Sequence, residues 1–150
     1  MEELLARYPR IFDTSKYHLD WSIPSTWIPT VDTLCSSIQA ICDENNFQIT
    51  CIQMKEKYGA LRFYTDYGNP QIDKLIFAAE KATTHICQKC GESSDSVHPT
   101  TSGWVQYLCN KCRPIGNIHI HDHLTDTLIP VSEIVEGITP TTNLYITDEK

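Results

Sequence analysis

The chain has 150 residues, a formal net charge of −7 and 41% hydrophobic residues, which fits about one domain with a buried core. The acidic balance disfavours general affinity for nucleic acid, because binding to phosphates depends on Lys and Arg. The sequence contains no apolar run long enough to span a bilayer and no signal peptide at its start, so we expect a cytoplasmic protein that is not bound to a membrane.

The first third of the chain predicts two helices with an irregular segment between them. Residues 2–8 favour a short helix, and residues 11–29 are rich in Pro, Ser, Thr and aromatic side chains, which is typical of irregular structure. Apolar residues then recur at helical spacing over residues 31–46. Thr30 or Asp32 is the expected N-cap of this helix.

A β-hairpin and a further helix follow. Residues 47–54 and 61–65 alternate between apolar and polar side chains, which predicts two strands joined across residues 55–59. Asn69 and Pro70 mark the start of the helix, because Pro is tolerated at the first helical position. The helix leads directly into a cysteine motif.

Cationic and aromatic residues gather in the hairpin: Lys55, Lys57, Arg62 and Tyr64. Together they can present guanidinium and ring faces to a phosphate or to an acidic partner surface. A purely structural interpretation is that alternation buries Leu61 and Phe63, while Arg62 and Tyr64 line the opposite face with support from acidic residues of the helices. Both interpretations fit the sequence.

Two CxxC pairs form the strongest motif of the chain: Cys87 with Cys90, and Cys109 with Cys112. Eighteen residues separate the pairs, a spacing typical of a structural zinc site with four sulfur ligands. Such a shell leaves no position for water or substrate, so it indicates a role in folding. Gly91 supports this interpretation, because glycine readily takes the positive φ that a CxxC turn needs.

Other uses of these cysteines fit less well. Disulfides need an oxidising compartment, and a redox-active CxxC would not occur as two pairs outside a strand-to-helix context. An iron-sulfur cluster stays open by residue type, although paired CxxC turns more often bind zinc. The remaining cysteines, Cys35, Cys42 and Cys51, lie in apolar patterns and are expected to be small buried residues.

Histidines form a second cluster after the cysteine motif. His119, His121 and His123 fall on one side of an expected strand and could hold a second metal, although surface histidines on an edge strand also fit. His98, between the CxxC pairs, raises the alternative of an HNH nuclease. The further metal ligands of such an enzyme are missing, so the sequence favours no catalytic residue.

The string KEKYGALRFY at residues 55–64, followed by CQKCG at residues 87–91 and Trp104 before Cys109, resembles a family of small phage and bacterial proteins. Members of that family carry a KEKFGGLRFY-like hairpin, then CxxCG, a tryptophan and a final cysteine. The resemblance covers residues 4–112 and implies this architecture and a phage or bacterial setting, but no activity. Thr26 and Ala60 depart from it, because glycines are usual there.

These features together predict an α+β fold: a β-hairpin packed with two helices, a four-cysteine zinc ribbon or treble-clef-like module, and a β-rich tail. The expected boundaries are 1–86, 87–113 and 114–150, within one compact unit. We expect a non-enzymatic protein with a structural Zn²⁺ that binds a host or phage protein, in one form as an inhibitor of a host or defence factor. The alternatives are a zinc protein that binds nucleic acid or nucleotides, and a degenerate HNH-like or histidine-cluster metal hydrolase.

Overall fold

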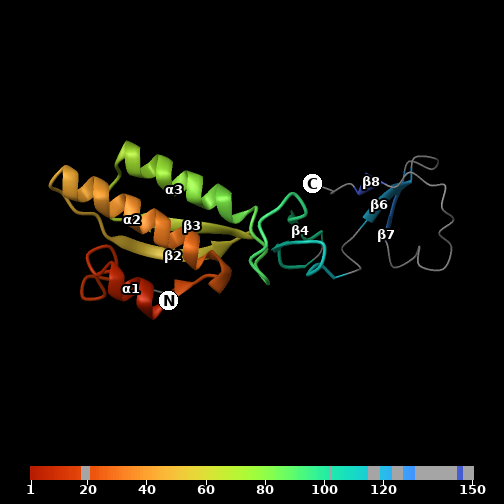
Figure 1. Cartoon of the computed structure of the whole chain (residues 1–150), viewed down its shortest axis with the longest axis horizontal. Helices are drawn as coiled ribbons and strands as arrows, with labels where there is room; N and C mark the ends of the chain where they lie inside the picture. Colours follow the sequence, from red (N-terminus) through yellow and green to blue (C-terminus); the bar gives the residue numbers. More distant parts are fainter. Residues whose placement is uncertain (18–20, 102, 115–118, 123–126, 131–144, 147–150) are drawn as a thin grey trace.

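The computed structural model describes residues 1–17, 21–101, 103–114, 119–122, 127–130 and 145–146. The described residues form helices packed on a mainly antiparallel sheet, and short strands follow the last helix (Figure 1), so the expected α+β class is confirmed. The helices are α1 (Glu2–Arg7), the 3₁₀ helix η1 (Ser25–Trp27), α2 (Ile28–Glu44) and α3 (Pro70–Thr83). Among these described helices, none combines the length and the apolar character needed to cross a lipid bilayer.

The main sheet has the strand order β1-β2-β3, with β1 (Trp21–Ser22) parallel to β2 (Cys51–Lys57) and β2 antiparallel to β3 (Ala60–Thr65). The connection between β2 and β3 is shorter than expected. Lys55 to Lys57 belong to the strand, and the turn consists of Tyr58 and Gly59, whose φ angles are +53° and +78°. Two positive φ angles are typical of the two-residue turns that match the twist of a hairpin.

Helix α2 begins earlier than its apolar periodicity predicts, and the expected N-caps are wrong. The N-cap is Trp27, which makes no side-chain cap bond, and Pro29 lies in the first turn, where its missing N–H costs nothing. Asp32 lies inside the helix, where its Oδ1 accepts hydrogen bonds from Arg7 Nη1 at 2.7 Å and from Tyr8 Oη at 3.0 Å. The carboxylate therefore ties α1 to α2 instead of capping a helix.

Helix α3 begins where the sequence predicts. Asn69 Oδ1 accepts hydrogen bonds from the backbone N–H groups of Gln71 and Ile72, at 2.9 and 3.2 Å. This satisfies two of the donors that a helix start leaves without partners.

One hydrophobic core lies between the helices and the main sheet. Helices α2 and α3 run side by side along the sheet (Figure 1). The largest fully buried side chains come from every part of this layer: Trp27, Ile11, Ile38, Ile49, Met54, Leu61 and Ile72. Cys35, Cys42 and Cys51 are fully buried in the same core, as expected from the sequence.

The outer edge of β3 is covered by α3. The Leu61 N–H donates to Thr83 Oγ1 at 3.1 Å, and the Phe63 N–H donates to Glu80 Oε1 at 3.1 Å. An uncovered edge strand offers its N–H groups to other chains, and here two of them have helix side chains as acceptors. The last turns of α3 are thereby held beside the hairpin, close to the start of the cysteine motif.

Beyond α3 the strands are short. β4 (His98–Pro99) pairs with β5 (Tyr107–Leu108) in an antiparallel sheet. A third sheet has the strand order β7-β6-β8, formed by β6 (His119–Asp122), β7 (Thr127–Pro130) and β8 (Tyr145–Ile146). The rest of the expected β-rich tail lies outside the described residues.

Candidate metal centre

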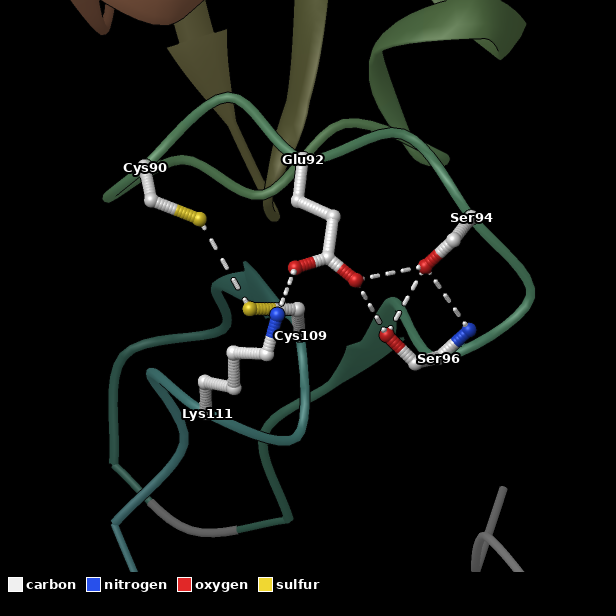
Figure 2. Close-up of polar contacts among 6 residues, drawn as sticks. All are labelled: Cys90, Glu92, Ser94, Ser96, Cys109 and Lys111. Carbon is white, nitrogen blue, oxygen red and sulfur yellow. Dashed lines mark hydrogen bonds and ion pairs between the residues drawn. The ribbon is translucent and has the colours of Figure 1, made fainter.

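The four cysteines of the CxxC pairs come together in space. Their Sγ atoms all lie within 4.8 Å of one another, and Cys90 Sγ is 3.7 Å from Cys109 Sγ (Figure 2). Four thiolates about 2.3 Å from a tetrahedral zinc ion lie about 3.8 Å from one another. A disulfide would need about 2.05 Å between its sulfurs, and all the cysteines are free. The spacing therefore fits one metal ion with four sulfur ligands.

The first CxxC turn follows the end of α3 and is closed by two backbone hydrogen bonds. The Gly91 N–H donates to the Cys87 carbonyl at 2.8 Å, and the Cys87 N–H donates to the Glu92 carbonyl at 2.8 Å. So tight a loop needs a residue with positive φ, and the φ of Gly91 is +80°. The positive φ predicted for Gly91 is confirmed.

The second CxxC turn follows β5 directly. The backbone N–H groups of Cys112 and Arg113 both donate to the Cys109 carbonyl at 3.0 Å. The Gln88 N–H donates to the Tyr107 carbonyl at 2.9 Å, which joins the first turn to the strand that leads into the second. These backbone hydrogen bonds hold the two CxxC turns next to each other, so that the two pairs of sulfurs face one common position.

The local electrostatics favour the thiolate form of Cys87 and oppose that of Cys109 and Cys112. Burial raises the pKa of Cys87, but hydrogen bonds from the backbone N–H groups of Cys109, Cys90 and Lys89 outweigh it and lower the pKa to about 6. Burial raises the pKa of Cys112 to about 12, and the neighbouring thiols and the charge of Cys87 act in the same direction. A divalent cation between the sulfurs would offset the cost of burial and the repulsion between neighbouring thiolates, so that all four thiols could ionise.

The centre lies at the surface of the protein. Cys87 and Cys109 are fully buried, Cys112 is half-buried, and Cys90 is exposed. A chelator or an oxidant can therefore reach the centre from the side of Cys90.

An ion pair that the sequence analysis did not identify joins the two CxxC turns. Lys111 Nζ, within the second turn, lies 3.4 Å from Glu92 Oε2, just after the first (Figure 2). The hydroxyls of Ser94 and Ser96 donate to Glu92 Oε1 at 3.0 and 3.1 Å. These hydrogen bonds, with Ser94 the stronger influence, lower the pKa of Glu92. The feature of the sequence that could have drawn attention to Lys111 is the lysine at the third position of both CxxC pairs.

The segment that carries the centre, residues 87–113, is called the cysteine-rich segment below, and it packs against the turn of the β2–β3 hairpin. A Cβ added to Gly59 would lie only 2.8 Å from Tyr107 Cδ2, so the glycine permits a close approach. Gln88 Nε2 donates to the Gly59 carbonyl at 3.2 Å, and Trp104 Nε1 donates to Glu56 Oε2 at 2.9 Å. The hairpin and the centre are thus fixed to each other.

The four hairpin residues predicted to bind a partner share the sheet face that points away from the core: Lys55, Lys57, Arg62 and Tyr64. Leu61 and Phe63 are buried on the core side, so the predicted alternation is confirmed. Arg62 Nη1 donates to the Leu61 carbonyl at 2.8 Å and lies 3.7 Å from Glu80 Oε2. This contact supports the structural interpretation of Arg62, and binding of a partner by the four residues stays a prediction.

The predicted histidine site is only partly covered by the described residues. The backbones of His119 and His121 lie in β6, opposite Pro130 and Leu128 of β7. His123 lies outside the described residues. A second metal site at His119, His121 and His123 therefore stays a prediction. His98, the histidine between the CxxC pairs, pairs through its backbone with Leu108.

Comparisons with known proteins give no identity for the chain. No family model, no curated protein and no solved structure matches it significantly. The resemblance to small phage and bacterial proteins stays a prediction.

Proposed function

We propose that this chain is a small zinc-binding protein that binds a partner protein and catalyses no reaction. The convergence of Cys87, Cys90, Cys109 and Cys112, with all Sγ atoms within 4.8 Å, carries the proposal. Four thiolates select zinc or an iron-sulfur cluster, and paired CxxC turns are typical of structural zinc. A shell filled by sulfur has no position for a reacting water, which supports a role in folding and recognition.

The cysteine-rich segment is proposed to be a zinc ribbon or treble-clef-like module. The short strands β4 and β5 lie between the two CxxC turns in sequence and pair with each other. Besides the cysteines, its buried apolar residues are Val97 and Leu108. So small a cluster supports the view that the metal, more than hydrophobic packing, holds the segment together.

The partner is proposed to be a host or phage protein in the cytoplasm of a bacterium or of an infected cell. The resemblance of the hairpin and CxxCG strings to phage and bacterial proteins supports this setting, and inhibition of a host or defence factor is one form of the role. The net charge of −7 supports a protein partner over nucleic acid, because a polyanion is repelled by an acidic chain.

Affinity capture with metal analysis of the same preparation tests the proposal. Tagged wild type would be purified from bacterial lysate without chelator, beside a Cys90→Ser/Cys112→Ser variant that keeps the core cysteines. The expected result is one zinc per wild-type chain and a stoichiometric protein partner that the variant loses. Recovery of nucleic acid with no stoichiometric protein would contradict the proposal.

Nucleic-acid or nucleotide binding is the second candidate, favoured by the shared face of Lys55, Lys57, Arg62 and Tyr64. Binding of this kind weakens steeply with salt, because phosphate contacts release counterions. Titration of labelled oligo(dT) and oligo(U) at rising salt would reveal it. A steep salt slope that Arg62→Ala reduces would establish this candidate, and the absence of binding at low salt would remove it.

A further inference from the structure

A pocket of about 330 Å³ opens where the hairpin turn, the last turns of α3 and the cysteine-rich segment meet. Its lining combines cations, aromatic rings and one carboxylate: Tyr58, Arg62, Phe77, Glu80, Lys81 and Tyr107. These residues are far apart in sequence and come from three elements. The pocket therefore exists only in the folded chain, and the motif analysis could not identify it.

The charge of the pocket is opposite to that of the molecule. Arg62 and Lys81 lie at its wall, and Lys57 lies beside it with Nζ 5.5 Å from the Tyr58 ring. The carboxylate of Glu80 already accepts a hydrogen bond from the Phe63 N–H and faces Arg62. In a chain with a net charge of −7, this is a local cationic site. Such a site attracts a carboxylate at short range, while the rest of the surface repels a long polyanion.

Exposed aromatic rings flank the same cations. Tyr58 is 70% exposed and Phe77 is 59% exposed, although both carry large apolar rings. Lys81 Nζ lies 5.2 Å from the centre of the Phe77 ring. Tyrosine, phenylalanine and arginine are the residues that protein interfaces concentrate, and exposed rings around a pocket are typical of a binding site.

The cysteine-rich segment supplies one wall of the pocket. Tyr107 precedes Cys109 by two residues, and its ring packs against the backbone of Gly59. Its carbonyl accepts the hydrogen bond from the Gln88 N–H that joins the two CxxC turns. The shape of the pocket therefore depends on the integrity of the metal centre.

We propose that this pocket binds an acidic segment of a partner protein. A carboxylate of that segment pairs with Arg62 and Lys81, and a neighbouring apolar or aromatic side chain packs between Tyr58, Phe77 and Tyr107. The pocket is lined by residues of three elements and has the volume of a few side chains, which suits a short part of a polypeptide more than a continuous phosphate backbone. This inference rests on the proposed function, and it names the chemistry of the partner and the surface that binds it.

Fluorescence anisotropy with three labelled peptides and an oligonucleotide tests the inference on metal-loaded protein. The probes are short peptides that contain one copy of Glu-Glu-Trp, Gln-Gln-Trp or Lys-Lys-Trp, and oligo(dT). The expected order of affinity places Glu-Glu-Trp first, with Gln-Gln-Trp weaker and the other two not bound. Arg62→Ala, Lys81→Glu and Phe77→Ala should each weaken binding of Glu-Glu-Trp by about tenfold or more.

Two substitutions provide matched controls. Arg10→Ala removes one positive charge, as Arg62→Ala does, from a side chain that is 58% exposed and paired with Asp43. Tyr67→Ala removes a ring that is 68% exposed and does not line the pocket. Both should bind Glu-Glu-Trp as the wild type does. Circular dichroism in the near ultraviolet would verify that every variant keeps its folded core.

The outcomes separate this inference from the proposed function. Equal binding of all three peptides, preference for oligo(dT), or no effect of Lys81→Glu and Phe77→Ala would overturn the inference. If folded, zinc-loaded protein binds no peptide, only the inference fails and the zinc proposal stands. If the preparation holds no zinc, the proposed function fails first. Release of the metal with a chelator should also abolish peptide binding.

Discussion

Two regions of the molecule differ in how much apolar surface they bury. One is the layer formed by the main sheet and its helices, and the other is the cysteine-rich segment. The first has one cluster of eighteen buried residues, whereas the second has four, two of which are Cys87 and Cys109. Burial of one aliphatic side chain contributes about 1.5 to 3 kcal/mol, and ordering one residue costs about 1 to 2 kcal/mol of backbone entropy. Val97 and Leu108 cannot order a segment of this length by burial alone, so the difference indicates that its fold depends on the sulfur centre.

Removal of one sulfur ligand should have the largest effect, and it should be confined to one region. Zinc centres in small domains contribute about 10 to 16 kcal/mol of apparent binding free energy, so Cys109→Ser should unfold the cysteine-rich segment and leave the core folded. Hydrogen exchange would then show lost protection at the amides of Gln88 and Gly91, with protection of Leu61 retained. Cys35→Ala is the control, since Cys35 is buried in the core and is not near the centre. Uniform loss of protection across the chain would contradict the separation of the two regions.

The converse substitution weakens the core and spares the centre. Leu61 is fully buried, so Leu61→Ala should lower the free energy of unfolding by about 2 to 5 kcal/mol. Denaturation in urea at saturating zinc measures this loss, and zinc affinity should not change. Ile52→Ala, at a side chain that is 37% exposed, should cost less. If Leu61→Ala lowered zinc affinity as much as stability, the two regions would not be separable.

A pair of glycine substitutions measures the contact between the two regions. Gly59 and Gly103 both have positive φ, at +78° and +74°, but a Cβ on Gly59 would meet the Tyr107 ring, and one on Gly103 would meet no atom within 4 Å. Both Gly→Ala variants incur backbone strain of order 1 to 3 kcal/mol, and Gly59→Ala should lose more because it also displaces Tyr107. Thermal unfolding at saturating zinc gives the comparison. Equal losses would mean that the turn does not pack tightly on the cysteine-rich segment.

The smallest expected effect on stability comes from replacing Asp66, a carboxylate in the core region. Burial raises the pKa of Asp66, but hydrogen bonds from the Thr50 N–H at 2.7 Å and from Lys16 Nζ at 3.2 Å outweigh it and lower the pKa. A lowered pKa in the folded state adds stability above the unfolded pKa of about 3.9, and this stability is lost as the pH falls through the folded value.

Asp66→Asn should therefore cost about 1 kcal/mol near neutral pH and less in acid. Urea denaturation of wild type and variant at both pH values measures the difference, and loss of the metal in acid affects both alike. A difference that grows as the pH falls would contradict this account of Asp66.

Features set by neighbouring residues could be predicted from the sequence. Asn69 and Pro70 start α3, and the positive φ of Gly91 follows the CxxC turn, because cap and turn chemistry act over a few residues. The approach of the two sulfurs within each CxxC pair was also predictable from their spacing, and a separation of eighteen residues is typical of two pairs that share one metal ion.

Features set by contacts between distant residues could not be predicted. The charged string at residues 55–57 is typical of a turn, yet these residues continue the strand and pair with residues 60–62 of β3. Asp32 has the residue type of an N-cap but binds Arg7 of α1 and Tyr8, the residue that follows that helix. The pocket between Phe77 and Tyr107 depends on how the cysteine-rich segment packs, and helical periodicity carries no information about that.

The metal content of the purified chain tests the central claim most directly. Native mass spectrometry of protein prepared without chelator, with hydrogen exchange before and after chelation, measures both the ion and its effect. The account predicts one zinc per chain, and a loss of protection on chelation that is restricted to the cysteine-rich segment. A chain that carries no metal, or one whose exchange pattern does not change when the metal is removed, would contradict it.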